Sequence, residues 1–185
     1  MSLFEFVTVM VSMILALCLG HLLQSASFLA KTERDVRHHL PYTLWSVLIL
    51  LTVVNHWWSL WDMRAVDWNY VSFLYILVSP VLISFATGLL APAQAGTGPI
   101  DLATHFDRVR RLFAGILTAY VLVMWFDGPL FAGQAVFGKI GVMHIPIIAA
   151  NLMPALTASH RVHAVAAAVA IGMLFILMIL RYISM

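Results

Sequence analysis

Five polar side chains lie within long apolar segments of this chain, and they are the residues that could bind or move a ligand. They are His21, Asn55, His56, His144 and Asn151. Imidazole and carboxamide groups need hydrogen-bond partners in a membrane, because hydrocarbon offers none. The depth of each side chain in its segment therefore decides which of them can meet.

Helical geometry predicts two pairs of these side chains at matching depth. At about 1.5 Å per residue, His56 lies roughly 22 Å from the inner end of its segment, and His144 lies at a similar height. His21 and Asn151 both come out at about 12–14 Å. His144 and Asn151 are seven residues apart, so they share a helix face. With Asn55 beside His56, the five residues predict a polar interior in an otherwise apolar bundle.

Three interpretations of this polar interior are open. The groups can hold helices together through hydrogen bonds, or they can line a path for an ion or small molecule. His56 and His144 can also be the two axial ligands of a haem held between facing helices, although no spacing motif indicates one. No other cofactor is predicted.

Several reaction classes are disfavoured by what the sequence lacks. It has no His-Glu-x-x-His, no Gly-x-Ser-x-Gly and no glycine-rich phosphate loop. All acidic residues are expected in loops or at segment ends, whereas a proton-coupled carrier usually keeps a carboxylate inside the membrane. The single cysteine, Cys18, excludes cysteine-rich metal sites. We predict no catalytic residue and no metal site, which favours a non-enzymatic protein.

The composition indicates an integral membrane protein. Of 185 residues, 63% are hydrophobic and only 10% are charged, whereas soluble domains have about half and about a quarter. So few charges could not cover a soluble surface. The net charge of +2 is too small to indicate nucleic acid as a partner.

Six apolar segments have the length of a membrane-spanning helix, which is about 20 residues. The expected spans are residues 4–29, 41–61, 68–90, 108–126, 138–158 and 162–183. The fifth contains Pro146 and Pro154, and each proline removes a backbone donor. The glycine-rich stretch 128–140 could be re-entrant. Asp101 is a candidate N-cap for the helix that enters the fourth span. We predict an all-α bundle of six transmembrane helices in one domain, residues 1–185.

Basic and aromatic residues predict the orientation. Seven basic residues fall on one side of the predicted spans and three on the other, so the positive-inside rule places both termini outside the cytoplasm. Lys31 and six arginines form the predicted cytoplasmic set: Arg34, Arg37, Arg108, Arg110, Arg111 and Arg161. Tryptophans are expected at the outer interface: Trp57, Trp58, Trp61, Trp68 and Trp125.

Three further features bear on ligands and partners. Ser72, Tyr75 and Ser79 share one face of the third span and are a candidate cavity wall. The cluster of Trp57, Trp58 and Trp61 could bind a lipid or another apolar ligand. A lipid- or quinone-binding assembly subunit is an alternative function. Small residues spaced by four in the sixth span, Ala164, Ala168 and Gly172, allow close helix approach. Membrane lipids and a second copy, or another membrane subunit, are therefore the expected partners.

Some stretches of the chain resemble a family of proteins. These stretches are Gly20-His21-Leu22-Leu23-Gln24, Asn55-His56-Trp57-Trp58-Ser59-Leu60-Trp61 with the preceding Leu44-Trp45, and Asp101-Leu102-Ala103-Thr104-His105-Phe106 with Arg108, Arg110 and Arg111. They resemble an uncharacterised family of small bacterial multi-pass membrane proteins over roughly the first 115 residues. The resemblance implies a bacterial inner membrane and no mechanism. It also marks His21, Trp58 and Arg110 as candidates for a functional role.

Overall fold

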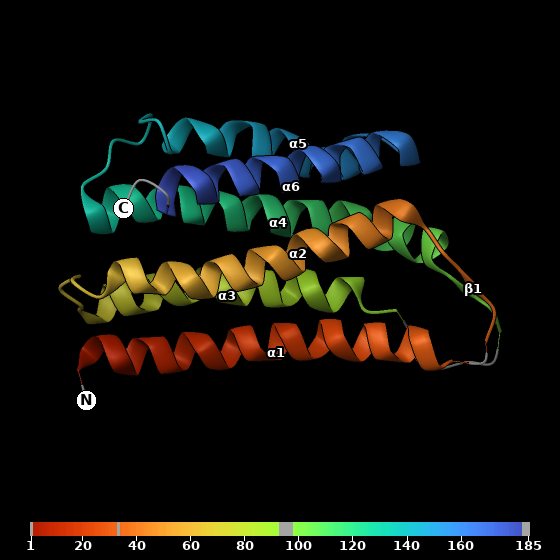
Figure 1. Ribbon diagram of the computed structural model, residues 1–185, viewed down its shortest axis with the longest axis horizontal. Coiled ribbons are helices and arrows are strands. Elements are labelled where there is room, and N and C mark those ends of the chain that lie inside the picture. The colour runs from red at the N-terminus through yellow and green to blue at the C-terminus, as the bar shows by residue number, and fades with distance from the viewer. Residues whose placement is uncertain (1, 33, 93–97, 183–185) are drawn as a thin grey trace.

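The computed structural model describes residues 2–32, 34–92 and 98–182, and in these residues the chain is almost entirely helical (Figure 1). Six α-helices follow one another, with two short 3-10 turns and two very short strands between them. They are α1 (Leu3–Lys31), β1 (Val36–Arg37), α2 (Leu40–Ser59), η1 (Leu60–Met63), α3 (Tyr70–Leu90), β2 (Ile100–Asp101), α4 (Leu102–Ala132), η2 (Gly141–Met143), α5 (His144–Leu156) and α6 (His160–Tyr182).

The helices form an antiparallel bundle in which each runs opposite to the one before it (Figure 1). α1 packs on α2 and α3, α4 lies between α3 and α5, and α6 packs on α5 and α2. The start of α1 and the end of α6 lie at the same end of the bundle, which we call the terminal end (Figure 1). At the opposite end, β1 and β2 pair in parallel, with Val36 beside Ile100. We call this the basic end, because α1 ends there at Lys31 and α4 and α6 begin there with four arginines nearby.

Side-chain caps and one glycine set several helix ends. Ser2 and Glu5 form a reciprocal capping box at the start of α1. The Asp101 carboxylate accepts hydrogen bonds from the backbone N–H groups of Ala103 and Thr104, each at 3.0 Å. The bond from Thr104 is the main cause that lowers the pKa of Asp101. Gly133 ends α4 with φ of 61°, a left-handed conformation that favours glycine. The expected N-cap at Asp101 is confirmed.

Five helical stretches are long and apolar enough to cross a membrane within the described residues. They are Leu3–Lys31, Leu40–Met63, Tyr70–Leu90, Leu102–Phe131 and His160–Arg181, and a shorter apolar stretch covers Gly141–Leu156. The prediction of a helical membrane bundle is therefore confirmed, whereas the fifth predicted span contains a helix of only 13 residues. Residues 128–132 of the stretch considered re-entrant continue α4.

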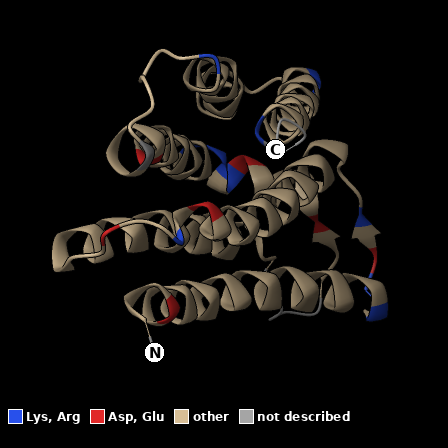
Figure 2. Ribbon diagram, turned by 60° about the vertical axis from the view of Figure 1, so that its left-hand side comes forward, with Lys and Arg blue, Asp and Glu red and all other residues tan. Residues whose placement is uncertain are grey.

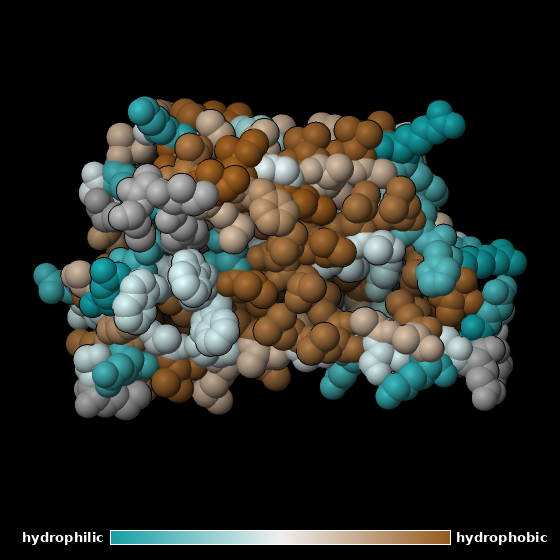
Figure 3. Space-filling view, in the orientation of Figure 1, coloured by the Kyte–Doolittle hydropathy of each residue, from teal (hydrophilic) through white to brown (hydrophobic). Residues whose placement is uncertain are grey.

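The surface has the distribution that a membrane protein needs. An apolar band crosses the middle of the bundle and hydrophilic residues gather at the two ends (Figure 3). Lys and Arg residues lie toward the helix ends and in the connections (Figure 2). The small-residue face of α6 is not covered within the described chain, since Ala168 and Gly172 are exposed.

Candidate functional site

A cavity lies inside the bundle between α2, α4, α5 and α6. Its volume is about 90 Å³, which is room for a few water molecules or a small solute at about 30 Å³ per water. Its α6 lining runs from Ala170 to Arg181, or about 16 Å at 1.5 Å per residue. It therefore extends from the middle of the bundle to the terminal end. Its polar lining comes from all four helices and the connection before α5: Thr52, Asn55, Tyr120, Trp125, Asp127, Gln134, His144, Asn151 and Arg181.

Three of the buried lining side chains carry oxygen atoms that accept no hydrogen bond. These atoms are Oδ1 of Asn55, Oδ1 of Asn151 and both carboxylate oxygens of Asp127. The three side chains are 7%, 1% and 5% exposed. Leaving a buried polar atom without a partner costs about 1–3 kcal/mol, and more if it is charged. The side chains that line the cavity therefore hold acceptor oxygens that no protein group satisfies.

The charged groups of the site lie at the terminal end. Arg181 of α6 forms an ion pair with Asp62 of η1, with Nε and Oδ2 2.9 Å apart. Asp127 lies near this arginine and beside the Tyr75 hydroxyl of α3. That hydroxyl donates to the backbone carbonyl of Val123 at 2.8 Å. Asp127 is thus the acidic side chain of the cavity lining, and Asp62 already neutralises the arginine beside it.

One wall of the cavity is a stacked pair of rings held by the connection before α5. The rings of Trp125 and His144 are parallel within 3°, with centroids 5.9 Å apart. Trp125 Nε1 donates to the carbonyl oxygen of Val136 at 2.8 Å. His144 Nδ1 lies 3.2 Å from the carbonyl oxygen of Gly141. The residues around Val136 and Gly141 thus fix the orientation of both rings.

His56 lies one layer behind the cavity. It is 1% exposed, and its Nδ1 lies 3.2 Å from the hydroxyl of Tyr120, which is itself a lining residue. Its Nε2 is buried with no hydrogen-bond partner. His56 and His144 contact different aromatic residues, and only His144 lines the cavity. Among the described residues, no group of three or more His, Cys, Asp or Glu side chains could hold a metal ion.

The structure brings together three of the five residues predicted to form a polar interior. Asn55, His144 and Asn151 line the same cavity, and His56 is connected to it through Tyr120. The prediction for His21 is wrong, because its side chain is exposed on the outer surface of α1. Depth along the helix grouped Asn55, His144 and Asn151 as the structure does. Depth alone, however, does not say which way a side chain points.

Asp127 is the candidate site residue that sequence reasoning missed. We expected the fourth span to end at 126, and so placed Asp127 just outside it. α4 instead continues to Ala132, and Asp127 is buried inside the bundle. Asp127 does lie near the end of a span, as expected for the acidic residues, but its burial inside the bundle was not expected. The available signal was spacing, since Tyr120 and Asp127 are seven residues apart and share a helix face.

The three residues predicted to form a cavity wall on α3 lie in different environments. Ser72 and Tyr75 line a separate surface groove at the terminal end, together with Leu130 and Phe131 of α4. Ser79 does not reach that groove, because it is fully buried and its hydroxyl donates to the carbonyl of Ile76 in its own helix.

The five predicted interface tryptophans also separate into two sets. Three of them are exposed by about 60% each, Trp57 and Trp58 at the end of α2 and Trp61 in η1, as expected for an interfacial belt. They line an apolar surface groove with Phe4 and Thr8 of α1. Trp68 is partly buried against Phe131, with ring centroids 5.7 Å apart. Trp125 faces the cavity, which corrects its assignment to the belt.

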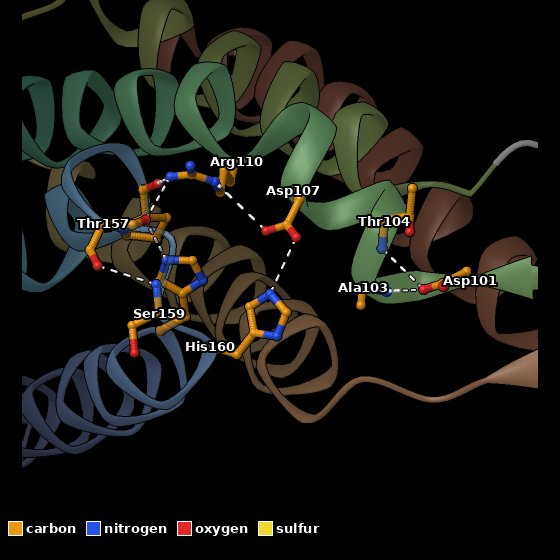
Figure 4. Close-up of polar contacts among 10 residues, drawn as sticks. Asp101, Ala103, Thr104, Asp107, Arg110, Thr157, Ser159 and His160 are labelled. Atoms are coloured by element: carbon orange, nitrogen blue, oxygen red, sulfur yellow. Dashed lines mark hydrogen bonds and ion pairs between the residues drawn. The ribbon is translucent and has the colours of Figure 1, made fainter.

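Arg110 holds the ends of two helices together at the basic end (Figure 4). Its guanidinium donates to the backbone carbonyl oxygens of Pro154 and Thr157 at the C-terminus of α5, the second at 2.6 Å. It also lies 3.7 Å from the carboxylate of Asp107, whose other oxygen is 3.2 Å from His160 Nε2. Its side chain is only 12% exposed. Arg110 therefore differs from the exposed Arg108, Arg111 and Arg161, which we predicted alongside it.

Three histidines pack together beside this network. The ring of His39, just before α2, meets the ring of His160 edge-on at 4.5 Å between centroids. His163 Nε2 lies 2.9 Å from the carbonyl oxygen of Thr157. Both ring nitrogens of His39 are buried without a hydrogen-bond partner. Burial, followed by the charge of His160, lowers the pKa of His39 below its ordinary value.

The buried state of His39 predicts that acid destabilises the protein. Because the folded state lowers the pKa of His39, the unfolded chain binds the proton more readily, and stability is lost as pH falls below the ordinary histidine value of about 6.5. We expect the thermal unfolding midpoint in detergent to fall as pH is lowered from about 7.5 to about 5.5. His39→Gln should reduce this slope, and the exposed His38→Gln should leave it unchanged. Equal slopes for wild type and His39→Gln would contradict the prediction.

The fold and the cavity define a class, a helical integral membrane protein with a polar cavity among its apolar helices. Comparisons of the chain with protein-family models, with curated proteins and with solved structures find no match.

Proposed function

We propose that this chain is a small transporter-like module that takes up a polar solute in the cavity between α2, α4, α5 and α6. The observation that carries this proposal is the set of acceptor oxygens of Asn55, Asp127 and Asn151, which are buried in the cavity without hydrogen-bond partners. Groups that only hold helices together would be bonded across the helix interface. Here these oxygens are buried without such a bond, in side chains that line a cavity about 16 Å long.

The proposed arrangement in the membrane has six crossings and both termini outside the cytoplasm, in a bacterial inner membrane. The short η2–α5 stretch makes the fifth crossing with the help of the connection before it. The basic end then faces the cytoplasm, which agrees with the positive-inside rule. The cavity extends toward the terminal end, so a solute would enter from the non-cytoplasmic side.

Flux into liposomes tests the proposal. The purified protein in liposomes should carry at least one small polar probe among Na⁺, K⁺, methylammonium, urea and glycerol faster than protein-free liposomes. The double variant Asn55→Leu/Asn151→Leu should lose most of this flux, because both acceptors are replaced by apolar groups of similar size. Ser79→Ala is the matched control, since Ser79 is also buried and lies outside the cavity lining. Absence of flux for every probe would overturn the proposal and favour an assembly subunit.

A further inference from the structure

Asp127 is a carboxylate in an unusual position for a membrane helix. It is 5% exposed and lines the cavity, and neither of its oxygens makes a well-formed hydrogen bond, although the Tyr75 hydroxyl lies close enough to interact with it. The hydroxyl beside it, that of Tyr75, is already directed to the Val123 carbonyl. A buried ionised carboxylate is strongly disfavoured unless an opposite charge accompanies it. Asp127 must therefore hold a proton or lie next to a cation.

In the part of the chain that the structure describes, no neighbouring cation pairs with this carboxylate alone. From α6, Arg181 approaches, and it is ion-paired with Asp62 of η1 at 2.9 Å. His144 of α5 lies in the same cavity and stacks on Trp125. The remaining titratable groups that face this region are phenols and an imidazole, namely Tyr75 of α3, Tyr120 of α4 and His56 of α2. With Arg181 balanced by Asp62, the cavity carries one negative charge when Asp127 is ionised.

The rest of the lining favours a small organic cation with N–H donors. The oxygens of Asn55 and Asn151 have no partner in the protein and are acceptors for N–H groups, and Trp125 and Tyr120 are aromatic lining residues of the kind that attract a cation. Dehydrated Ca²⁺ or similar ions need about six or more converging oxygen ligands, and the lining has fewer acidic and amide groups than that. The volume of about 90 Å³ limits the ligand to a few heavy atoms.

We propose that Asp127 exchanges its proton for one small ammonium ion, so that the cavity works as a proton–cation exchange site. With the cavity empty, the Asp127 carboxyl is neutral. When a cation R–NH₃⁺ enters, the Asp127 O–H bond breaks, one proton leaves to the solvent and the carboxylate pairs with the ammonium group. One positive charge replaces another, so the net charge of the cavity stays constant. This inference rests on the proposed transport function and names its substrate class and its coupling.

Proton release on binding tests this exchange. Methylammonium chloride is added to the purified full-length protein in detergent at low buffer strength, with binding followed by calorimetry and pH by an indicator dye. We expect about one proton released per methylammonium bound, and an affinity that rises up to tenfold per pH unit while Asp127 is protonated. Asp127→Asn should bind methylammonium at least tenfold more weakly, release no proton and lose the pH dependence. Asp127→Glu should retain proton release.

The matched control is Asp67→Asn, which removes an exposed carboxylate at the same end of the bundle but outside the cavity. It should behave as wild type. Proton release that persists in folded Asp127→Asn, verified by gel filtration, would overturn the inference, as would release driven by Na⁺ but not by methylammonium. Flux of urea or glycerol without any methylammonium binding would overturn the exchange while leaving the proposed transport function standing. If no probe crosses the membrane, both the exchange and the proposed transport function are overturned.

Discussion

Arg110→Met is expected to destabilise the protein more than any other single loss of charge at the basic end. The guanidinium of Arg110 donates to two backbone carbonyls at the end of α5, Pro154 and Thr157. The last carbonyls of a helix have no partner within it, so this arginine serves as a C-cap supplied by α4. Hydrogen bonds to charged groups contribute about 1.5–3 kcal/mol each. We expect a loss of roughly 3 kcal/mol, because the carbonyl of the buried Pro154 loses its charged donor, whereas the carbonyl of Thr157 keeps its contact with His163 Nε2.

Two companion variants separate the hydrogen bonds of Arg110 from its charge. Arg108→Met removes the same charge from an exposed position two residues earlier, and its effect should stay within about 0.5 kcal/mol. Arg110→Lys keeps the charge but loses the planar fork that can reach two acceptors at once. Its loss should be intermediate. Thermal unfolding in detergent, read by circular dichroism, gives the three values. Equal effects of Arg108→Met and Arg110→Met would show that only charge matters at this end.

The helical bundle could be predicted from the sequence because apolar runs of about 20 residues have few alternatives to a membrane helix. Helix ends were predictable only where a specific residue sets them, as Asp101 does for α4. The end of α4 could not be predicted in this way. Pro129 and Gly128 are typical of a helix end, yet the helix passes through them and ends at Gly133, whose φ is positive.

The candidate site was predictable in part, and the residues that failed share a physical cause. Sequence spacing gives the height of a side chain along its helix but not the neighbour that the side chain faces. His21 and Asn151 were matched in height, but α1 lies at the edge of the bundle and turns His21 outward, whereas Asn151 faces the cavity. Arg110 was predicted from its charge and from the family resemblance, and neither reveals a contact with backbone carbonyls. Asp127 failed because its burial depended on the wrongly placed end of α4.

Gly141→Ala is expected to disrupt the connection that closes one side of the cavity. A Cβ atom at this position would lie 1.9 Å from the carbonyl oxygen of Val136 and 3.1 Å from Trp125 Nε1. The first is a backbone atom, so no side-chain rotation relieves the overlap. The Val136 carbonyl would have to move and would release the hydrogen bond from Trp125, which stacks on His144. Overpacking costs about 1–3 kcal/mol and the lost hydrogen bond adds about 1 kcal/mol.

The control for Gly141→Ala is Gly115→Ala on the exposed side of α4, where an added Cβ meets no atom within 4 Å. That change should raise stability by about 0.5–1 kcal/mol, because alanine loses less backbone entropy in a helix than glycine. The two variants add the same methyl group, so opposite shifts in the thermal unfolding midpoint isolate the contact with Val136. Gly141→Ala should also increase the rate of proteolysis between α4 and α5 and weaken solute uptake, since the ring pair of Trp125 and His144 loses its support. The prediction is contradicted if the Gly141→Ala protein is as stable as Gly115→Ala and takes up solute normally. The connection would then adapt at little cost, and the cavity wall would not depend on Gly141.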